Sequence, residues 1–490
     1  MKRKTAILPT VLLALCVFIS PACVKKPEQP APDGTPLPNG VTAEPSAVPS
    51  EKPIVFDPET DYDNRYGSLI ASDMLETEDA FYLHSRNGNG FLYYYDKASG
   101  LSGVLCPRPE CVHDEKRNNA ECAGYIGSEQ PSLQYYQGKL WYVNATKGMK
   151  IGLFRMNLDG SSKELVHEFD PVGTNLEFGN RRLYIHRGMI YHAGCRQEVK
   201  NAAVFHKLVY GCIPMEDTVI GGQKVKAWEY YEILERDTIN QPQPTMFFAG
   251  DSVYMFYDYD GVAEYDGMDS EDEFYDWRSE LPIKDEIARW DPSMTEPEIL
   301  YQSVESYPML SNYRWSIVAS DGTPYFVYTY RLDPEREDGE NNPYIIRLYR
   351  LEKDGTRTCV LDTSDREGNT FLLALGGGVI ATADTSIFSM DDRDQPVNVS
   401  IIRFGADGTD VIYEGPLPLE YRSELRIGVK RIMLADCWVS EDTLILYSSE
   451  YYGKKDYDRS WHFVKYDITP DGLTETVVSE GFEVQFWGSN

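Results

Sequence analysis

The sequence predicts an all-β fold, a seven-bladed β-propeller, with six or eight blades as the neighbouring possibilities. Three observations lead to this prediction. A unit of four short strands recurs along the chain, no helical periodicity separates the units, and aromatic residues make up 13% of the sequence, which favours strands over helices. A β-solenoid would also repeat, but its repeats are about half as long and leave no room for two hairpins.

The repeat is clearest at four hairpins. In each, an alternating strand ends in Asp-Gly, where glycine supplies the positive φ that a tight turn needs. The four segments are residues 153–161, 348–356, 401–409 and 463–472. A second short apolar run follows each turn and further strands precede it, so the unit consists of four strands.

Marker residues on the same strand of each unit give the number of units. The markers are Tyr95, Arg155, Arg289, Arg350, Arg403 and Lys465. Their spacings are 60, 134, 61, 53 and 62 residues, and the 134 corresponds to two periods. We therefore expect an unmarked unit around residues 180–235 and seven units in total. Closure of the ring should pair the first strand, near residues 66–72, with the last blade.

The N-terminal segment indicates export. Residues 2–4 are basic, residues 6–19 are mainly apolar, and small residues lead into Cys23. The apolar run is too short to span a bilayer comfortably and is typical of a signal peptide. We predict a lipoprotein signal at residues 1–22 with Cys23 as the lipidated residue. An ordinary secretory signal, cleaved near Ala22, is the alternative.

A tether should follow the signal. Residues 24–60 contain nine prolines and few large apolar residues, so they cannot bury enough surface to fold. We predict the lipidated cysteine and a disordered tether at residues 23–60, and the propeller at residues 61–490.

The Asp-Gly hairpins, together with the signal and tether, resemble the Tol-B-like β-propeller surface lipoproteins of Gram-positive bacteria. The resemblance covers most of residues 62–490. It implies a protein at the surface of a bacterial cell, attached to the membrane by a lipid on Cys23.

Composition limits the partners. The chain has 47 Lys and Arg against 78 Asp and Glu, a formal net charge of −31, which argues against nucleic acid and against adhesion to anionic lipid by a basic face. Hydrolase, metalloprotease and nucleotide-binding motifs are absent. We expect a monomeric binding or scaffold module for a protein, peptide or glycan partner. A propeller enzyme that acts on glycans with paired carboxylates is the alternative.

A cysteine–histidine motif follows the first predicted unit. Cys106, Cys111, His113 and Cys122 have the spacing C-x4-C-x-H-x8-C. Three thiols and an imidazole within 17 residues can surround a structural zinc ion, although the spacing is not that of a known zinc finger. A disulfide between two of the thiols is the alternative in an oxidising exterior, and reduced thiols are a third.

Two other groups of residues are weaker candidates. Cys195 and Cys212 flank 16 residues and are expected either to form a disulfide or to stay reduced and buried. Aromatic residues near an acidic insertion could offer stacking surfaces to a ligand, or could simply pack between blades. These are Tyr257, Tyr259, Tyr275 and Trp277.

The acidic insertion itself is a possible calcium site. Oxygens of Asp258, Asp260, Glu264 and Asp266 could coordinate Ca²⁺, but their order does not fit an EF-hand loop. A solvated acidic face is the simpler interpretation.

Overall fold

The computed structural model divides the chain into two units, Met1–Lys52 and Pro53–Asn490. It describes residues 54–65, 72–85, 90–113, 121–127, 131–146, 150–170, 182–200, 203–238, 244–260, 283–304, 316–333, 342–385, 397–418, 429–452, 459–469 and 471–482. The predicted signal and Cys23 lie outside these residues. Among the residues described, no helix is both long and apolar enough to cross a bilayer.

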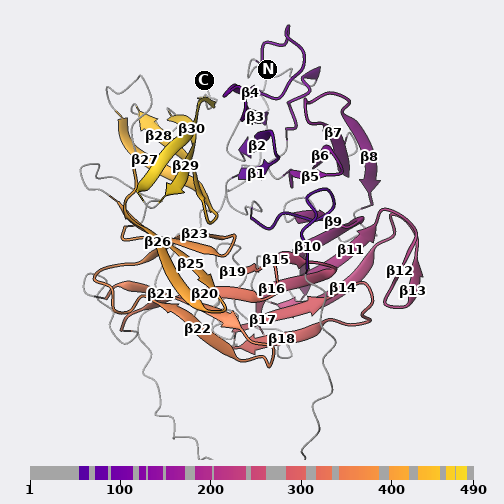
Figure 1. Cartoon of the computed structure of the whole chain (residues 1–490). Coiled ribbons are helices and arrows are strands. Elements are labelled where there is room, and N and C mark those ends of the chain that lie inside the picture. The colour runs from indigo at the N-terminus through magenta and orange to yellow at the C-terminus, as the bar shows by residue number, and fades with distance from the viewer. Residues whose placement is uncertain are drawn as a thin grey trace, which may run out of the picture. The chain divides into compact units, whose positions relative to one another are not determined.

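The second unit is a seven-bladed β-propeller (Figure 1). In the described part of the chain, seven antiparallel sheets of four strands each follow one another, and the first strands of neighbouring blades lie side by side, as β1 does beside β5. In Figure 1 the blades run in colour order, and the last blade lies beside the first.

The first three blades have the following strands. Blade 1 contains β1 (Ser72–Glu76), β2 (Ala80–Ser85), β3 (Leu92–Asp96) and β4 (Ser102–Val104). Blade 2 contains β5 (Gln134–Tyr136), β6 (Lys139–Ala145), β7 (Ile151–Asn157) and β8 (Glu164–Phe169). Blade 3 contains β9 (Arg182–His186), β10 (Met189–Lys200), β11 (Ala203–Pro214) and β14 (Tyr231–Thr238). A separate hairpin, β12 (Thr218–Ile220) and β13 (Gln223–Val225), is inserted before β14.

The last four blades are regular in strand order. Blade 4 contains β15 (Thr245–Ala249), β16 (Ser252–Asp260), β17 (Ile283–Trp290) and β18 (Glu298–Ser303). Blade 5 contains β19 (Ser316–Val318), β20 (Pro324–Arg331), β21 (Tyr344–Leu351) and β22 (Arg357–Asp362). Blade 6 contains β23 (Phe371–Gly376), β24 (Val379–Ala383), β25 (Asn398–Gly405) and β26 (Gly408–Pro416). Blade 7 contains β27 (Val429–Val439), β28 (Thr443–Tyr452), β29 (Arg459–Thr469) and β30 (Gly472–Phe482).

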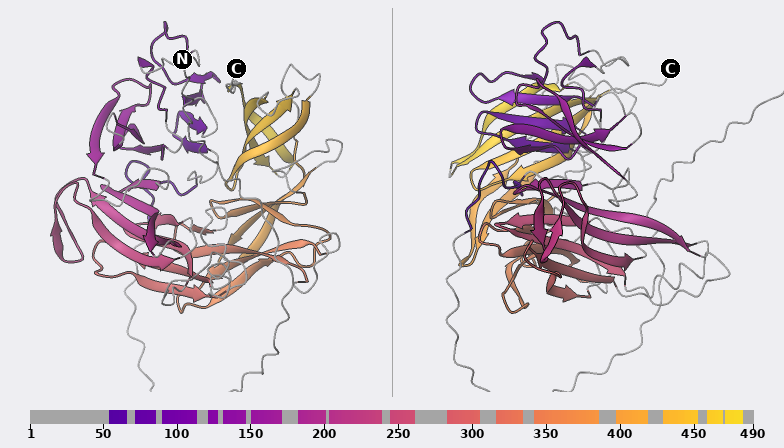
Figure 2. Two further views of the ribbon diagram at one scale, coloured as in Figure 1. Left: turned by 180° about the vertical axis from the view of Figure 1, so that it is seen from behind. Right: turned by 90° about the vertical axis from the view of Figure 1, so that its right-hand side faces the viewer.

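The repeat predicted from the sequence is confirmed. All six markers fall on the third strand of a blade, and the unmarked unit is blade 3. Blade 3 lacks the Asp-Gly hairpin because β12 and β13 are inserted between its third and fourth strands, and its long β10–β11 hairpin extends beyond its neighbours (Figure 2). The glycines of the predicted turns have positive φ, 80° at Gly160 and 82° at Gly355.

Hydrophobic clusters fill the spaces between blades. Alternating strand residues face the two neighbouring blades, so each sheet contributes to two clusters. In blade 4, for example, Ile287 packs toward blade 5 and Ala288 toward blade 3. Such two-sided burial explains why the strands contain long apolar runs.

The strand pairing predicted to close the ring falls mainly on residues outside the described ranges. β1 pairs with β2 of its own blade, and the sheet of blade 7 consists of β27 to β30. Residues 66–71 and 483–490 lie outside the described residues. Side chains fill the space between blades 7 and 1, where the rings of Phe81 and Phe463 lie 5.6 Å apart.

The compact unit begins at Pro53, before the boundary at residue 61 that the sequence predicts. Residues 54–65, which we call the strap, cross the first-to-second-strand turns of blades 2 and 3 and reach β15 of blade 4. The amide of Gln137 donates to Glu59 O (2.9 Å), and the amide of Arg187 donates to Thr60 O (2.8 Å). Asn64 makes two hydrogen bonds with the main chain of Phe248.

Candidate functional site

The outer strand of blade 1 is built in two halves. The first half is β4, which pairs with β3 from Tyr95 to Tyr93, and Leu105 then donates its amide to Leu92 O (2.8 Å). The second half returns at Gly124, whose carbonyl accepts the amide of Leu92 at 2.7 Å. Residues 106–123 are therefore an insertion that interrupts the outer strand of blade 1, between two segments that both pair with β3.

The second half continues along β3 in the same antiparallel register. Phe91 and Tyr125 form a β-bridge, and the amide of Ile126 donates to Gly90 O (2.9 Å). The two halves meet closely, because a Cβ added at Gly124 would lie 2.7 Å from Leu105 O. Only glycine fits at that junction without displacing the main chain.

The cysteine–histidine motif occupies the insertion. Cys106 and Cys122 stand at its two ends, and Cys111 and His113 lie between them. One ligand atom from each of the four side chains lies within 4.8 Å of every other. The sulfurs of the three cysteines are not bonded to one another. The structure thus brings together all four residues that the sequence grouped, and the cluster could hold a metal ion such as zinc.

The pKa values of two of the three thiols are shifted in opposite directions. Burial raises the pKa of the Cys122 thiol to about 12, and the neighbouring sulfurs of Cys111 and Cys106 act in the same direction. Burial also acts to raise the pKa of Cys106, but hydrogen bonds from His113 and from the main chain of Arg108 and Ala123 outweigh it and lower the pKa to about 6. The Cys106 thiol therefore loses its proton more readily than a free cysteine does, and the resulting thiolate is the form that binds metal.

His113 is held in an uncommon conformation. Its φ is 51°, in the left-handed region that residues other than glycine rarely adopt. Its Nε2 atom is buried, and within the described residues this atom has no hydrogen-bond partner. The ring packs edge-on against Phe91 at 6.1 Å between centroids. Such a conformation, at a half-buried imidazole whose Nε2 atom is buried, is what a ligand position would require.

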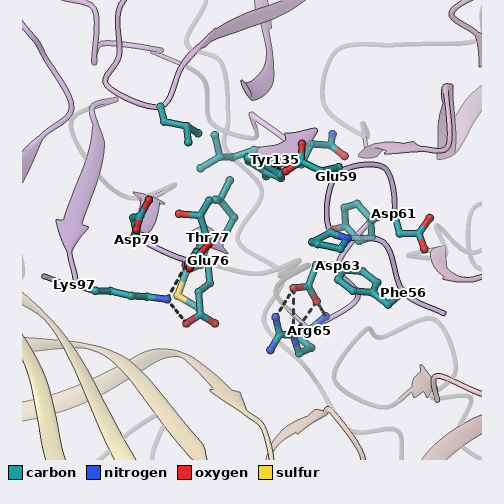
Figure 3. A pocket seen from close by; sticks show the side chains of 18 residues that line it. Phe56, Glu59, Asp61, Asp63, Arg65, Glu76, Thr77, Asp79, Lys97 and Tyr135 are labelled. Atoms are coloured by element: carbon teal, nitrogen blue, oxygen red, sulfur yellow. Dashed lines mark hydrogen bonds and ion pairs between the residues drawn. The ribbon is translucent and has the colours of Figure 1, made fainter. Parts of the chain in front are cut away.

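A second site lies between the strap and the inner edges of blades 1 and 2. Here a pocket of about 480 Å³ is lined by the strap, by β1 and its turn, and by β5 (Figure 3). Its apolar and aromatic lining includes Phe56, Leu75, Leu133, Tyr135 and Leu158. A ligand of a few residues' size would fit a pocket of this volume.

The charged residues of the pocket are mostly carboxylates. Six acidic side chains line it against two basic ones, Arg65 and Lys97. Lys97 Nζ donates to Glu76 at 2.7 Å and Arg65 Nη2 to Asp63 at 2.7 Å, as Figure 3 shows. Two further carboxylates, Glu78 and Asp79, stand exposed on the turn between β1 and β2. The acidic residues therefore outnumber the bases that can neutralise them.

The strap wall of this pocket is fixed by a charged contact. Asp61 accepts hydrogen bonds from Arg187 Nε (2.6 Å) and Nη2 (3.0 Å), and its side chain is 4% exposed. Burial acts to raise the pKa of Asp61, but the bonds from Arg187 and from the amide of Asp57 leave the pKa below its usual value. Sequence reasoning missed this contact because the partners are 126 residues apart.

A histidine also holds the strap. His186 accepts the amide of Tyr62 at Nδ1 (3.0 Å), and its Nε2 lies 2.7 Å from Gly250 O, so the ring is neutral with its proton on Nε2. Burial lowers the pKa of His186, and the nearby Arg187 also lowers it. The only sequence signal for this segment was Tyr62, an aromatic residue just after the last proline of the tether.

Of the aromatic candidates that are described, Tyr257 is buried and Tyr259 is half-buried. Tyr257 is fully buried in β16 and donates its hydroxyl to Glu286 at 2.6 Å, and Tyr259 donates to the same carboxylate at 2.8 Å. These two rings pack between blades 3 and 4, as the alternative interpretation held. Tyr275 and Trp277 lie outside the described residues, as do Glu264 and Asp266 of the possible calcium site.

Asp258 of that possible calcium site is buried, with 8% of its surface exposed, and pairs across the sheet with Asp285. The interpretation of this residue as part of a solvated face is therefore wrong. Asp260 is the last residue of β16.

The positions of Cys195 and Cys212 do not fit the disulfide hypothesis. They lie on the hairpin β10–β11, where Cys195 is opposite Leu208 and Cys212 is opposite Tyr191. Four residues of strand, roughly 13 Å, separate them, whereas a disulfide needs Cα atoms within about 7 Å.

Comparison with known proteins assigns the chain to no family. No protein-family model matches the sequence, and no curated protein matches it. The chain is similar in structure to the acylaminoacyl peptidase of Pyrococcus horikoshii, with 11% identity, a TM-score of 0.42, and coverage of 85% of this chain and 54% of the peptidase. The chain thus spans about half the length of that enzyme.

Two other structures show a similar degree of likeness. An ulvan lyase, a polysaccharide lyase, has 9% identity and a TM-score of 0.39 over 85% of this chain and 94% of the lyase. TolB from Acinetobacter baumannii has 12% identity and a TM-score of 0.26 over 84% of this chain and 80% of its own. These are distant structural similarities, and they assign the chain to no family.

Proposed function

We propose that the chain is a non-catalytic binding module that receives a basic segment of a peptide or protein in the pocket beside the strap. The observation that carries this proposal is the lining of that pocket, which combines six acidic side chains with apolar and aromatic ones. Propellers are rigid scaffolds, and the strap and turns that form the pocket are the kind of elements on which binding residues are found.

The chemistry of the pocket suits a lysine or arginine side chain. The aliphatic stem of such a side chain would pack on Leu133, Leu158 and the ring of Phe56. Its charged head would reach Glu78 and Asp79, which are exposed at the rim. The formal net charge of −31 would speed the approach of a cationic partner.

The test uses two fluorescein-labelled pentapeptides, one rich in lysine and its twin with glutamine in place of each lysine. We expect the lysine peptide to bind at least tenfold more tightly, a difference of about 1.4 kcal/mol. The double variant Glu78→Gln with Asp79→Asn should remove this preference. Equal affinity of the two peptides, or of the variant and the wild type, would contradict the proposal.

A matched control comes from blade 5. Asp365 and Glu367 are exposed acids after β22 and do not line the pocket. The variant Asp365→Asn with Glu367→Gln has the same change of net charge, so it should bind the lysine peptide as the wild type does. This control separates local contacts from the general attraction of an acidic protein.

The alternative, an enzyme that acts on glycans, has less support. Asp258 and Asp285 are paired across β16 and β17, but both are buried and Tyr328 donates its hydroxyl to Asp285 at 2.7 Å. They do not line the pocket. Cleavage of any oligosaccharide by the purified chain would favour the enzyme over the binding module.

We further propose that the module is displayed on the surface of a bacterial cell, attached by a lipid on Cys23 and monomeric. The supporting features are the signal-like residues 1–22 and the prolines that follow. Cys23→Ala should release the protein into the medium with its unfolding temperature unchanged. Retention of this variant in the membrane fraction would contradict the lipid anchor.

We also propose that Cys106, Cys111, His113 and Cys122 bind one structural zinc ion. Three sulfurs and one nitrogen complete a tetrahedron and leave no open position for catalysis. Zinc should copurify at about one ion per chain under reducing conditions. A disulfide between any two of these cysteines in every molecule, found by mass spectrometry without reduction, would exclude the site.

A further inference from the structure

The seam between blades 7 and 1 is where the two ends of the ring meet. Among the described strands, each four-stranded sheet is built within one blade, and no strand pairing joins blade 7 to blade 1. Side-chain packing joins the two blades across this seam, and loosening it would raise local exchange in both.

The seam has its own hydrophobic cluster. Blade 1 contributes Met74, Phe81 and Leu83, and blade 7 contributes aromatic and aliphatic residues that include Trp438 and Tyr447. All are nearly inaccessible to solvent. The seam is therefore tightly packed at its inner and middle strands.

The cysteine–histidine cluster forms the outer part of the same seam. Cys122 is 3% exposed and belongs to this hydrophobic cluster, and Cys106 and Cys111 pack against it half-buried. Cys122, one of the four proposed metal ligands, is therefore part of the packing between blades 7 and 1.

The residues that flank the cluster face the other way, toward blade 2. Leu105 and Ile126, on either side of the insertion, belong to the cluster between blades 1 and 2. Tyr125 O accepts from Lys163 Nζ at 2.7 Å, and Ile126 O accepts from Asn144. The two halves of the outer strand therefore contact blade 2. The cysteine–histidine cluster between them packs in the seam with blade 7.

We infer that the metal ion acts as the clamp of the ring, joining the two halves of the outer strand of blade 1 and sealing the seam with blade 7. This inference rests on the zinc site proposed above. The ion links Cys106 at the end of the first half to Cys122 at the start of the second, a position where the main chain itself is interrupted. Both halves then stay paired with β3, and Cys122 stays packed in the seam.

The clamp predicts which part of the molecule responds when the metal is removed. Without the ion, the ends of the insertion are held by their few hydrogen bonds to residues 90–92, which open locally more easily than a long strand. Amide hydrogens of β3 and β28 should then exchange faster with solvent. Amides of β20 and β21, in blade 5 on another part of the ring, should exchange as before.

The experiment is hydrogen exchange followed by mass spectrometry on the full chain with zinc bound, after chelation, and after zinc is added back. We expect peptides from β3 and β28 to exchange at least tenfold faster after chelation and to recover with zinc. Peptides from β20 and β21 serve as the internal reference. Because chelation leaves the sequence intact, the test does not depend on a variant folding.

Variants supply the second arm. His113→Ala should lose zinc and reproduce the exchange pattern of the chelated protein. Cys359→Ser is the matched control, because Cys359 is exposed in β22 of blade 5 and should keep both zinc and protection. Fast exchange throughout His113→Ala, with β20 and β21 included, would contradict a local clamp.

Failure of the clamp and failure of the zinc site look different. Zinc that binds and is removed while β3 and β28 keep their protection would overturn the clamp and leave the zinc site standing. A protein that neither contains nor takes up zinc would overturn both.

Discussion

Two segments complete the propeller from outside its regular strands, and they are held in opposite ways. The strap, residues 54–65, is fixed by partners far along the chain, such as His186, Arg187 and Phe248. The cysteine–histidine loop, residues 106–122, brings four of its own side chains together at one point, where we propose that a metal ion holds them. The first depends on distant charges and main-chain groups, and the second on local chemistry. The strap should therefore respond to truncation and acid, and the loop to metal.

The largest expected effect is removal of the strap. A chain that starts at residue 66 loses the hydrogen bonds of Glu59, Thr60 and Asn64 and the packing of Tyr62 against Tyr184. We expect the free energy of unfolding to fall by about 4 kcal/mol, since each lost hydrogen bond contributes about 1 kcal/mol and buried aromatic area adds to this. Urea denaturation measures the change.

A chain that starts at residue 53 is the control for this truncation. It keeps every strap contact described here, so its unfolding should match that of the full chain. Equal stability of the two shortened chains would mean that the strap adds nothing to the fold.

The second prediction concerns the junction in the cysteine–histidine region. Gly124→Ala would place a Cβ about 2.7 Å from Leu105 O, where the main chain must move. We expect a loss of about 2–3 kcal/mol, in the range of overpacked sites. Gly405→Ala is the control, since a Cβ there meets no atom within 4 Å. If both variants unfold alike in a thermal melt, the two halves do not meet as described.

The third prediction returns to the strap. Arg187→Ala leaves the carboxylate of Asp61 buried without its main partner. Breaking a buried pair costs about 3–5 kcal/mol, but Arg187 is about one-third exposed, so we expect about 2 kcal/mol. The exposed pair of Arg155 and Glu164 provides the control, because Arg155→Ala should change stability by less than about 1 kcal/mol. A similar effect of the two substitutions on urea denaturation would contradict this.

The smallest expected effect is a dependence on pH. Because burial lowers the pKa of His186, the folded state favours the neutral ring. Its contribution is complete above the unfolded pKa of about 6.5 and is lost as the pH falls below that value. Asp61, whose pKa is also lowered, loses its contribution only below about pH 4. Between pH 7.5 and 5.5 we expect the strap to weaken by about 1 kcal/mol.

Trypsin cleavage after Arg65 reports the state of the strap in this pH range, once rates are corrected for the pH dependence of trypsin itself. His186→Gln, which can donate and accept without titrating, should flatten the profile. A wild-type profile as flat as that of the variant would rule out His186 as the titrating group.

The sequence was sufficient for most of the fold because the blades repeat. Asp-Gly at residues 159–160 and 354–355 is a local turn signal, and the marker positions follow from the regular length of each blade. Blade 3 was found only through its spacing, since β12 and β13 replace its turn signal. Local patterns thus predict units, whereas the packing of blade 7 against blade 1 brings together residues far apart in the chain.

The candidate sites were predicted less evenly. The four ligand residues lie within one short segment, so their types and spacing were enough to group them. The two-part outer strand was not predicted, because the pairing of Gly124 with Leu92 depends on where β3 lies. Composition likewise assigned residues 54–60 to the tether, since proline content does not reveal that the main-chain oxygens of Glu59 and Thr60 accept hydrogen bonds from amides far along the chain.

The interrupted outer strand has a consequence for engineering. Each half pairs with β3 through its own hydrogen bonds, so a peptide inserted between His113 and Cys122, which keeps all four cluster residues, should shift neither half. Doubling the length of that stretch would add only about 0.6 kcal/mol of closure entropy. An epitope or a small reporter domain grafted there would be carried on the rim of the ring, with both of its ends fastened.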